Sequence, residues 1–240
     1  MPVFRLGQEV LFPDPRLARE DGLLAVGGDL SPQRLLVAYS LGIFPWYNPG
    51  DPILWWSPDP RFVLFPRELH VPRRLNRFMK RSPFRITFDR AFDEVIQSCA
   101  SVRLERGEGT WLVPEMIKAY KLLHRLGFAH SVETWWEGEL VGGLYGVALG
   151  RVFFGESMFS TRPEASKCGL VALVERLLEW GFGLIDCQLH THHLERFGAR
   201  HIAREAFISL LSRLIAQGPD APRSWQEVEG RPGEEGAPGG

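Results

Sequence analysis

Residues 142–188 read GGLYGVALGRVFFGESMFSTRPEASKCGLVALVERLLEWGFGLIDCQ, and their pattern defines the class of fold. Apolar and aromatic residues fill 139–149 and 151–159, so both segments predict strands joined by a tight turn. A helix with one apolar side is predicted over 163–181, because a proline stands at its start and a glycine at its end. Residues 184–188 then predict a buried strand. This alternation indicates an α/β or mixed α+β domain.

The segments around this stretch carry similar local signals. Asp89 is placed to cap a helix that runs to about Arg103, and Pro114 begins another helix, which Gly127 ends. Apolar alternation predicts one strand before the first of these helices and another after the second. The further predicted elements are a helix from Pro32 to Gly42 with Ser31 as its N-cap, strands over 83–89 and 129–136, and a last helix over about 204–217.

The first part of the chain differs in composition from the rest, being rich in Pro, Gly and Trp. Residues 42–61 predict an ordered loop, because they are too aromatic for a flexible linker. Three tryptophans there either pack between two subdomains or form an aromatic wall for a ligand: Trp46, Trp55 and Trp56. We expect a small domain over 1–61, a larger domain over 62–217, and a disordered tail over 218–240.

Overall composition limits the class of protein. The chain has 240 residues, of which 45% are hydrophobic, enough for a substantial core. No apolar run approaches the roughly 20 residues of a membrane helix, and the N-terminus lacks the pattern of a secretory signal. The three cysteines are widely spaced and odd in number, which indicates reduced thiols. We therefore expect a cytoplasmic protein that does not interact with membranes.

Basic charge is concentrated in one segment, although the formal net charge is -1. Residues 67–85 contain seven basic residues and a single acid. Four of the basic residues follow helical spacing and would form one stripe on a helix: Arg73, Arg77, Lys80 and Arg81. Such a stripe is either a solvated face or a surface that contacts the phosphates of a nucleic acid.

Two carboxylates and an amide stand in or beside strongly apolar strands: Glu156, Asp186 and Gln188. Burying an unpaired charge is unfavourable, so such groups are paired, hydrogen-bonded or directed into a cleft. Asp186 and Gln188 are two apart in the predicted strand and share a face, whereas Cys187 points to the other face and is expected to be a packed thiol. The spacing leaves two interpretations open, a hydrogen-bonded core pair and a functional site.

Several known chemistries lack their motifs in this chain. There is no GxxxxGK[ST] loop, no CxxC and no GxSxG, and the glycines at 142, 143 and 146 do not fit GxGxxG. Four histidines lie close in sequence: His190, His192, His193 and His201. Two of these are adjacent, and no carboxylate completes a known ligand spacing, so no metal is expected.

Seven blocks of sequence, in order, have counterparts in a known family. They are GLLAVGGDLSPQRLLVAYSLGIFPWYNPGDPILWWSPDPR, GTWLVPEM, LGFAHSVETW, LVGGLYGVALGRVFFGESMFS, ASKCGL, LIDCQ and HLERFGA. Together they resemble the leucyl/phenylalanyl-tRNA–protein transferase family, over about Phe12 to Leu214. The resemblance implies a small N-terminal domain followed by an acetyltransferase-like domain of the acyl-CoA N-acyltransferase superfamily, used without acyl-CoA.

The resemblance also implies the reaction and its partners. Such enzymes move Leu or Phe, and Met less well, from aminoacyl-tRNA to the N-terminal α-amine of a protein that begins with Arg or Lys, which marks that protein for N-degron proteolysis. Aminolysis of the tRNA ester is downhill, so no cofactor and no metal are needed. We expect the enzyme to act as a monomer.

Site residues follow from the same resemblance. Asp186 orients Gln188, and the pair binds the attacking amine. Glu156 holds either the ammonium of the aminoacyl group or the cationic N-terminus of the acceptor, and at least one of the two carboxylates is expected to recognise substrate through its charge. The residues expected around the aminoacyl group and the terminal adenosine are Trp46, Trp111, Tyr120, Leu144, Phe153, Met158, Leu170, Leu173 and Ile185. Some family members carry Met at 144 and Phe at 173, so the preference between Leu and Phe stays open.

Three alternative functions make different demands on the sequence. An acetyltransferase that uses acetyl-CoA would want a Gly-rich pyrophosphate loop at a helix start, and none is found. A tRNA-binding module without catalysis would not need Glu156, Asp186 and Gln188 together. A peptidoglycan aminoacyltransferase would take a lipid-linked acceptor, and the chain shows no membrane-facing feature. The protein aminoacyltransferase is therefore the favoured interpretation.

Overall fold

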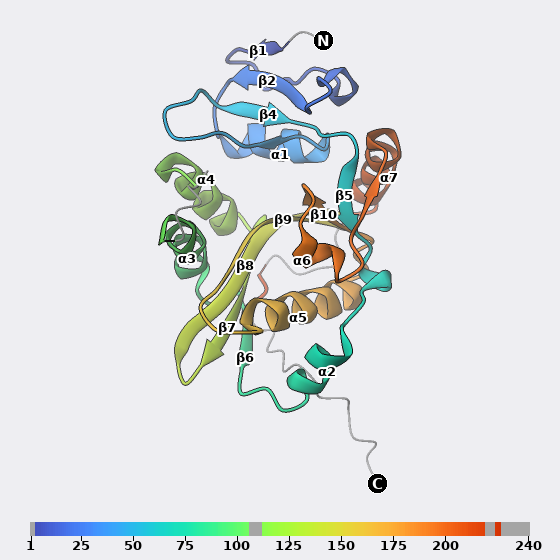
Figure 1. Ribbon diagram of the computed structural model, residues 1–240. Helices are drawn as coiled ribbons and strands as arrows, with labels where there is room; N and C mark the ends of the chain where they lie inside the picture. The colour runs from blue at the N-terminus through green and yellow to red at the C-terminus, as the bar shows by residue number, and fades with distance from the viewer. Residues whose placement is uncertain (1–2, 106–111, 219–223, 227–240) are drawn as a thin grey trace.

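A computed structural model describes residues 3–105, 112–218 and 224–226, in which two sheets lie at opposite ends of the molecule (Figure 1). The smaller sheet has the strand order β1-β2-β4-β3. Its elements are β1 (Phe4–Leu6), η1 (Pro15–Leu17), β2 (Leu23–Gly27), α1 (Pro32–Ser40), β3 (Phe44–Pro45) and β4 (Leu54–Trp56). Helix α1 begins as predicted, because the Ser31 hydroxyl accepts a hydrogen bond from the Arg34 backbone N–H at 3.4 Å.

The prediction of an irregular loop over 42–61 is only partly correct, because this segment contains β3 and β4 and the first residue of a third strand. Two- and three-residue strands interrupted by prolines give no alternation that could be read from sequence. Trp55 of β4 is completely buried, and its indole N–H donates to the Gly27 carbonyl at 2.8 Å. The tryptophan therefore fixes the sheet from within.

The larger sheet has seven strands in the order β11-β5-β10-β9-β8-β7-β6. These are β5 (Arg61–Leu64), β6 (Arg85–Phe88), β7 (Ala129–Trp136), β8 (Glu139–Leu149), β9 (Val152–Ser160), β10 (Leu184–Gln188) and β11 (Arg200–Ile202). Strands β9 and β10 are parallel, and the other neighbouring strands are antiparallel. The predicted strands β6 to β10 are all present, and together with the helices they confirm a mixed α/β fold.

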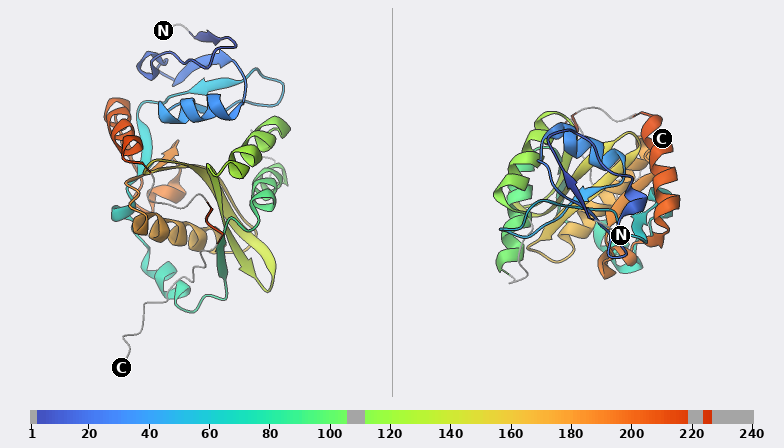
Figure 2. Two further views of the ribbon diagram at one scale, coloured as in Figure 1. Left: turned by 180° about the vertical axis from the view of Figure 1, so that it is seen from behind. Right: turned by 90° about the horizontal axis from the view of Figure 1, so that it is seen from above.

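Helices cover both faces of the larger sheet, as the two further views show (Figure 2). They are η2 (Pro66–Glu68), α2 (Arg73–Met79), α3 (Phe92–Glu105), α4 (Pro114–Arg125), α5 (Ala165–Glu179), α6 (His192–Glu195) and α7 (Arg204–Ala216). Helices α3 and α4 pack on one face and α5 on the other, while α1 contacts α4 and α7. No helix in these described ranges is long and apolar enough to cross a bilayer.

Two sequence-based expectations differ from the structure at the α3 face. Asp89 does not cap α3: it has a φ of +54°, and its carboxylate accepts from the Ser131 backbone N–H and lies 2.8 Å from His130 Nδ1. Trp225 falls in the segment expected to be a disordered tail, yet it is completely buried and stacks on His130 at 3.9 Å. Both differences have one cause, because the buried Asp89 carboxylate, which follows β6, accepts from the backbone N–H groups of Ser131 and Trp225.

Candidate active site

A cavity of about 520 Å³ opens where β9 and β10 separate. The two strands pair from Leu184–Val152 to Asp186–Phe154, and the residues that follow in each strand line the cavity instead. The structure brings these predicted site residues together in its wall: Trp46, Leu144, Phe153, Glu156, Met158, Leu170, Leu173, Ile185 and Gln188. The cavity thus combines an apolar wall with one carboxyl and one amide group.

Two other predicted residues do not line the cavity, and a third is not described by the structure. Tyr120 lies behind Glu156, and its hydroxyl oxygen is 2.8 Å from Glu156 Oε2. Asp186 is completely buried next to the cavity. Trp111 falls outside the described residues.

The apolar wall comes from β8, β9, β10 and α5. The side chains of Leu144, Phe153 and Leu173 are each at most 3% exposed, so they belong to the core as well as to the cavity. Gly146 in β8 allows this arrangement, because a Cβ there would lie 2.5 Å from the Phe153 ring. The same Cβ would lie 2.2 Å from the Phe154 carbonyl oxygen, so a larger residue at 146 would disturb the pairing of β8 with β9 as well as the phenyl ring. The wall is therefore rigid, and it suits an apolar side chain.

Asp186 forms a buried ion pair that the sequence reasoning did not find. Arg61 of β5 donates to its two carboxylate oxygens at 2.8 and 2.6 Å, and both side chains are at most 1% exposed. The guanidinium also lies over the rings of Phe44 and Phe207. A bidentate pair of this kind fixes the orientation of the carboxylate.

The paired carboxylate in turn fixes Gln188 through its backbone. Asp186 Oδ1 accepts from the Gln188 N–H at 2.9 Å, and Gln188 has a φ of +62°. An L-residue in this left-handed region is strained by about 1–2 kcal/mol, and the strand register shifts at the same place. The Gln188 side chain then reaches across to Glu156, where its Nε2 donates to Oε1 at 2.8 Å. Cys187 lines the same cavity as Gln188 and does not face away from it as expected, because the strand is irregular between Asp186 and Gln188. Burial raises the pKa of its thiol.

Glu156 lies in a ring of short contacts with two buried tyrosines. Tyr39 of α1 lies 2.7 Å from Glu156 Oε1, Tyr120 of α4 lies 2.8 Å from Oε2, and the two phenol oxygens are 2.6 Å apart. Burial is the largest cause of the raised pKa of Glu156, which is about 7. The negative charge of Asp186 adds to the increase.

Arg61 and Tyr39 belong to the hydrogen-bonded part of the site, and the sequence reasoning missed both. Tyr39 stands in the predicted helix from Pro32 without any sign of a polar role, although a buried phenol needs a hydrogen-bond partner. Arg61 begins a strand that was not predicted, and a completely buried guanidinium requires an anion. Each signal says that a partner exists, but neither identifies it, because the partners are more than a hundred residues away.

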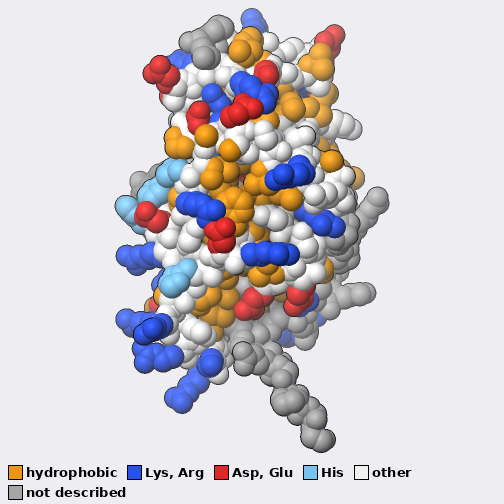
Figure 3. All heavy atoms as spheres, turned by 90° about the vertical axis from the view of Figure 1, so that its right-hand side faces the viewer, with side chains coloured by type: hydrophobic (Ala, Val, Ile, Leu, Met, Phe, Trp, Pro, Cys, Tyr) orange, Lys and Arg blue, Asp and Glu red, His pale blue; other side chains and the backbone are white. Residues whose placement is uncertain are grey.

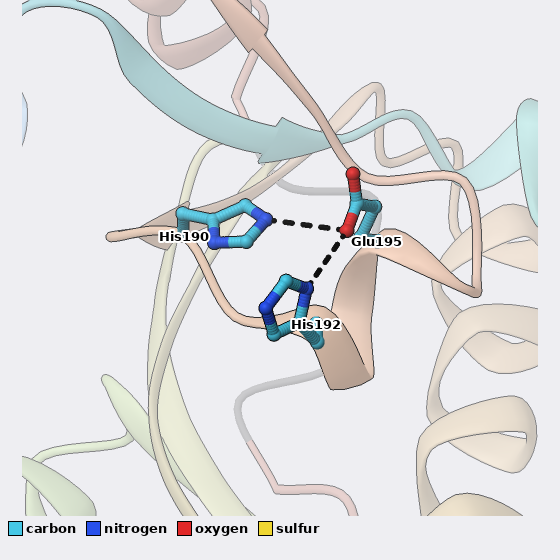
Figure 4. Close-up of side chains that lie close together, drawn as sticks. All are labelled: His190, His192 and Glu195. Carbon is cyan, nitrogen blue, oxygen red and sulfur yellow. Dashed lines mark hydrogen bonds and ion pairs between the residues drawn. The ribbon is translucent and has the colours of Figure 1, made fainter.

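The histidines after β10 form a small exposed cluster with Glu195 (Figure 4). His190 Nε2 lies 3.3 Å and His192 Nδ1 lies 3.2 Å from the same Glu195 oxygen. The sequence reasoning found no carboxylate at a suitable spacing, and the fold supplies one. Glu195 accepts from both imidazoles and ties the loop to α6. The expectation that the protein needs no metal stays a prediction.

The basic segment lies on α2 and directly after it. Figure 3 shows one side of the molecule, with Lys and Arg side chains gathered at its lower left. Arg73 and Arg77 are on the helix, whereas Lys80 and Arg81 follow its end at Met79, so the predicted single helical stripe is too long. The helix ends there because Pro83 is close and disfavours helix in the residue before it. All four side chains are exposed, and none forms an ion pair with another described residue.

A mixed α/β fold with an apolar cavity, a hydrogen-bonded amide and a buried carboxyl group suits a transferase that works by positioning its substrates. A sequence profile for the leucyl/phenylalanyl-tRNA protein transferase matches residues 63–212, and a profile for the N-terminal domain of the same enzyme matches residues 28–59. The chain belongs to the leucyl/phenylalanyl-tRNA protein transferase family.

Named relatives agree with this assignment. A leucyl/phenylalanyl-tRNA–protein transferase of Syntrophobacter fumaroxidans is 61% identical over 90% of this chain and 93% of its own. One from Anaeromyxobacter dehalogenans is 54% identical over 97% of this chain and 100% of its own. Solved structures are more distant: L-PGS from Bacillus licheniformis has a TM-score of 0.43 at 14% identity, covering 80% of this chain and 73% of that one. A GCN5-related N-acetyltransferase from Kribbella flavida has a TM-score of 0.37 at 14% identity, covering 72% and 61%.

Proposed function

We propose that this protein transfers Leu, Phe and, less well, Met from aminoacyl-tRNA to the N-terminal α-amine of proteins that begin with Arg or Lys. The observation that carries the proposal is the apolar cavity of about 520 Å³ that ends at Gln188 and Glu156. The transfer marks the acceptor for N-degron proteolysis, and the enzyme acts as a cytoplasmic monomer. The small sheet corresponds to a domain over 1–61, and the larger sheet to an acetyltransferase-like domain over 62–217 that works without acyl-CoA.

The apolar wall serves the donor. An aliphatic side chain without a branch at Cβ, or an aromatic one, fits between Leu144, Phe153, Leu170, Leu173 and Ile185, and a polar one would lose its hydration there without gaining a partner. Such a wall selects apolar side chains as a class and separates similar ones weakly. Trp46 is 38% exposed at the cavity and edge-on to Trp56, so its ring is available to the terminal adenosine.

The held amide serves the attacking amine. Because Gln188 Nε2 donates to Glu156, the amide oxygen is directed away from Glu156 and can accept a hydrogen bond from the α-amine. An α-amine has a pKa near 7.7–8.0, so about a tenth is neutral at pH 7 and positioning matters more than a strong base. Asp186, paired with Arg61, acts through the Gln188 backbone rather than on the amine itself.

Two buried polar atoms in the cavity wall have no partner among the described residues and are available to bind substrate. Ser157 Oγ and His193 Nε2 are buried in the cavity wall and have no hydrogen-bond partner within the described part of the chain. Buried groups of this kind normally have one. We assign them to polar groups of the bound substrates.

Incubation with charged leucyl-tRNA and a peptide that begins with Arg tests the function directly. We expect leucine to appear on the α-amine of this peptide, detected by mass. The same peptide with an acetylated N-terminus, or with Gly in the first position, should stay unmodified. Absence of transfer to the Arg peptide, together with acetylation of any amine from acetyl-CoA, would contradict the proposal.

The cavity wall also makes a prediction about donor preference. Leu173→Phe should shift the ratio of kcat/KM for leucyl- over phenylalanyl-tRNA in favour of leucyl-tRNA by about tenfold, because lost cavity space excludes the larger side chain first. Competition between the two charged tRNAs measures this ratio. Leu178→Phe is the matched control, since Leu178 lies on the same helix, is 37% exposed and does not line the cavity. An unchanged ratio in Leu173→Phe would remove this residue from the donor site.

A further inference from the structure

The contacts around Glu156 contain more hydrogen-bond positions than two tyrosines can fill. Three oxygen pairs lie at 2.6, 2.7 and 2.8 Å, joining Tyr39, Tyr120 and Glu156 into a closed triangle. Each pair needs one proton between its oxygens, since two oxygens this close repel each other without one. Each phenol brings one proton. An ionised Glu156 brings none, so one side of the triangle would be left without a hydrogen bond.

A protonated Glu156 supplies the missing proton. Gln188 also determines where that proton sits, because its Nε2 donates to Oε1 at 2.8 Å and makes Oε1 an acceptor. The acid proton is therefore on Oε2 and donates to Tyr120, whose hydroxyl donates to Tyr39, whose hydroxyl donates to Oε1. Each of the three contacts of the triangle then holds one proton, and each O–H donates one hydrogen bond.

We propose that Glu156, Tyr120 and Tyr39 share three protons in a closed ring, so that Glu156 is a neutral carboxylic acid in the resting enzyme and the two tyrosines are positioning residues that keep it so. Tyr39 and Tyr120 are both completely buried, which prevents water from supplying the missing hydrogen bond. The first of them comes from α1, so the N-terminal part of the chain contributes directly to the protonation state of the site.

The other groups near Glu156 are consistent with a neutral acid. On β10, Asp186 is negative but paired with Arg61 of β5, and Gln188 carries no charge. On β8, Tyr145 packs edge-on against Tyr120. None of these places a free cation beside Glu156, and burial favours the neutral form of a carboxyl group.

The role of the ring in transfer rests on the proposed function. The amine nitrogen forms a bond to the ester carbon while the bond from that carbon to the tRNA oxygen breaks, so the nitrogen loses one proton and the oxygen gains one. A protonated Glu156 can give its proton to the departing oxygen and receive the amine proton in exchange. The ring ends the cycle with three protons, as it began.

Infrared difference spectra test the ring without any substrate. Subtracting the spectrum of Glu156→Gln from that of the wild type should show the carbonyl band of a protonated carboxylic acid at pH 6, lost with a midpoint near pH 7. Absence of this band at pH 6 would overturn the proposal. The measurement uses the free enzyme, so its failure is distinct from a failure to detect aminoacyl transfer.

Removing one phenol hydroxyl shifts the midpoint of the Glu156 titration in opposite directions in the two models. Tyr39→Phe removes two of the three contacts of the triangle and leaves the one between Tyr120 and Glu156. If Glu156 is ionised, the Tyr120 proton alone occupies this contact. If Glu156 is neutral, the Tyr120 proton and the acid proton compete for it. The ring therefore predicts that the midpoint falls by about one pH unit in Tyr39→Phe, and likewise in Tyr120→Phe. If the tyrosines merely donate to a carboxylate, losing a donor raises the midpoint, and that result would refute the ring. Tyr47→Phe, another buried phenol of the N-terminal part, should leave the midpoint unchanged.

Discussion

Replacing Asp186 with alanine should lower the free energy of unfolding by about 3–5 kcal/mol, because it leaves the Arg61 guanidinium buried without its anion. Both side chains are at most 1% exposed, so solvent cannot compensate. Turnover by the fraction that remains folded should fall by about 10²–10⁴, since the Gln188 backbone loses the acceptor that fixes it. Urea unfolding and single-turnover transfer measure the two effects, and tRNA binding by the folded protein should stay close to that of the wild type.

A double substitution separates stability from activity. Arg61→Met with Asp186→Leu removes both charges and keeps apolar volume, so stability should return to near the wild-type value. Activity should not return, because neither new side chain accepts from the Gln188 N–H. Recovery of both properties in the double variant would show that Asp186 serves the fold alone. Near wild-type transfer by Asp186→Ala would remove it from the mechanism altogether.

The structure changes how the two carboxylates can take part in recognition. We expected at least one of them to read the cationic acceptor through its charge. The charge of Asp186 is matched by Arg61, and burial raises the pKa of Glu156 to about 7. Neither is a free anion below that pH. Glu156→Gln, which keeps the size of the side chain, is therefore expected to affect acceptor binding less than a charge-recognition role would require, and Glu156 is better described as a proton-holding group.

Local patterns were sufficient for most of the larger sheet, and the reason lies in its long elements. Strands β7, β8 and β9 have eight to eleven residues each, which is enough for apolar patterning and turn glycines to identify them. Strands β3 and β4 have two and three residues and cannot be identified in this way. Short strands are defined by their neighbours in space, and a single sequence does not list those neighbours.

The same distinction between local patterns and distant contacts applies to the site. Apolar wall residues such as Leu144 and Ile185 were found through motif positions, and the fold brings them together. Only half of the hydrogen-bonded part was predicted. Glu156 and Asp186 were recognised as carboxylates in apolar strands, but Tyr39 and Arg61 were not recognised. The missing information is long-range pairing, since 117 residues separate Tyr39 from Glu156 and 125 separate Arg61 from Asp186.

Replacing the four exposed basic residues of the α2 segment with alanine should weaken tRNA binding strongly and change its dependence on salt. Each lost phosphate contact lowers the slope of log affinity against log salt by about 0.7–0.9, so four contacts change the slope by about 3. Over a fourfold range of salt, this difference corresponds to about 60-fold in affinity. Binding measured at 50 and 200 mM salt, with leucyl-tRNA and an unrelated tRNA, gives both slopes. The loss should be similar for the two tRNAs, because phosphate contacts do not read sequence.

A second quadruple variant removes the same charge from other parts of the surface. Arg5, Lys118, Arg125 and Arg213 are also exposed and form no ion pair with another described residue, and they lie on β1, α4 and α7, away from α2. If only the total charge matters, this control should change the slope as much as the α2 variant does. If the α2 segment contacts the tRNA backbone, the control should keep a slope close to that of the wild type, because charges outside the interface release no counterions on binding. Equal slopes in the wild type and the α2 variant would mean that the basic segment is a solvated face and that the tRNA is held elsewhere.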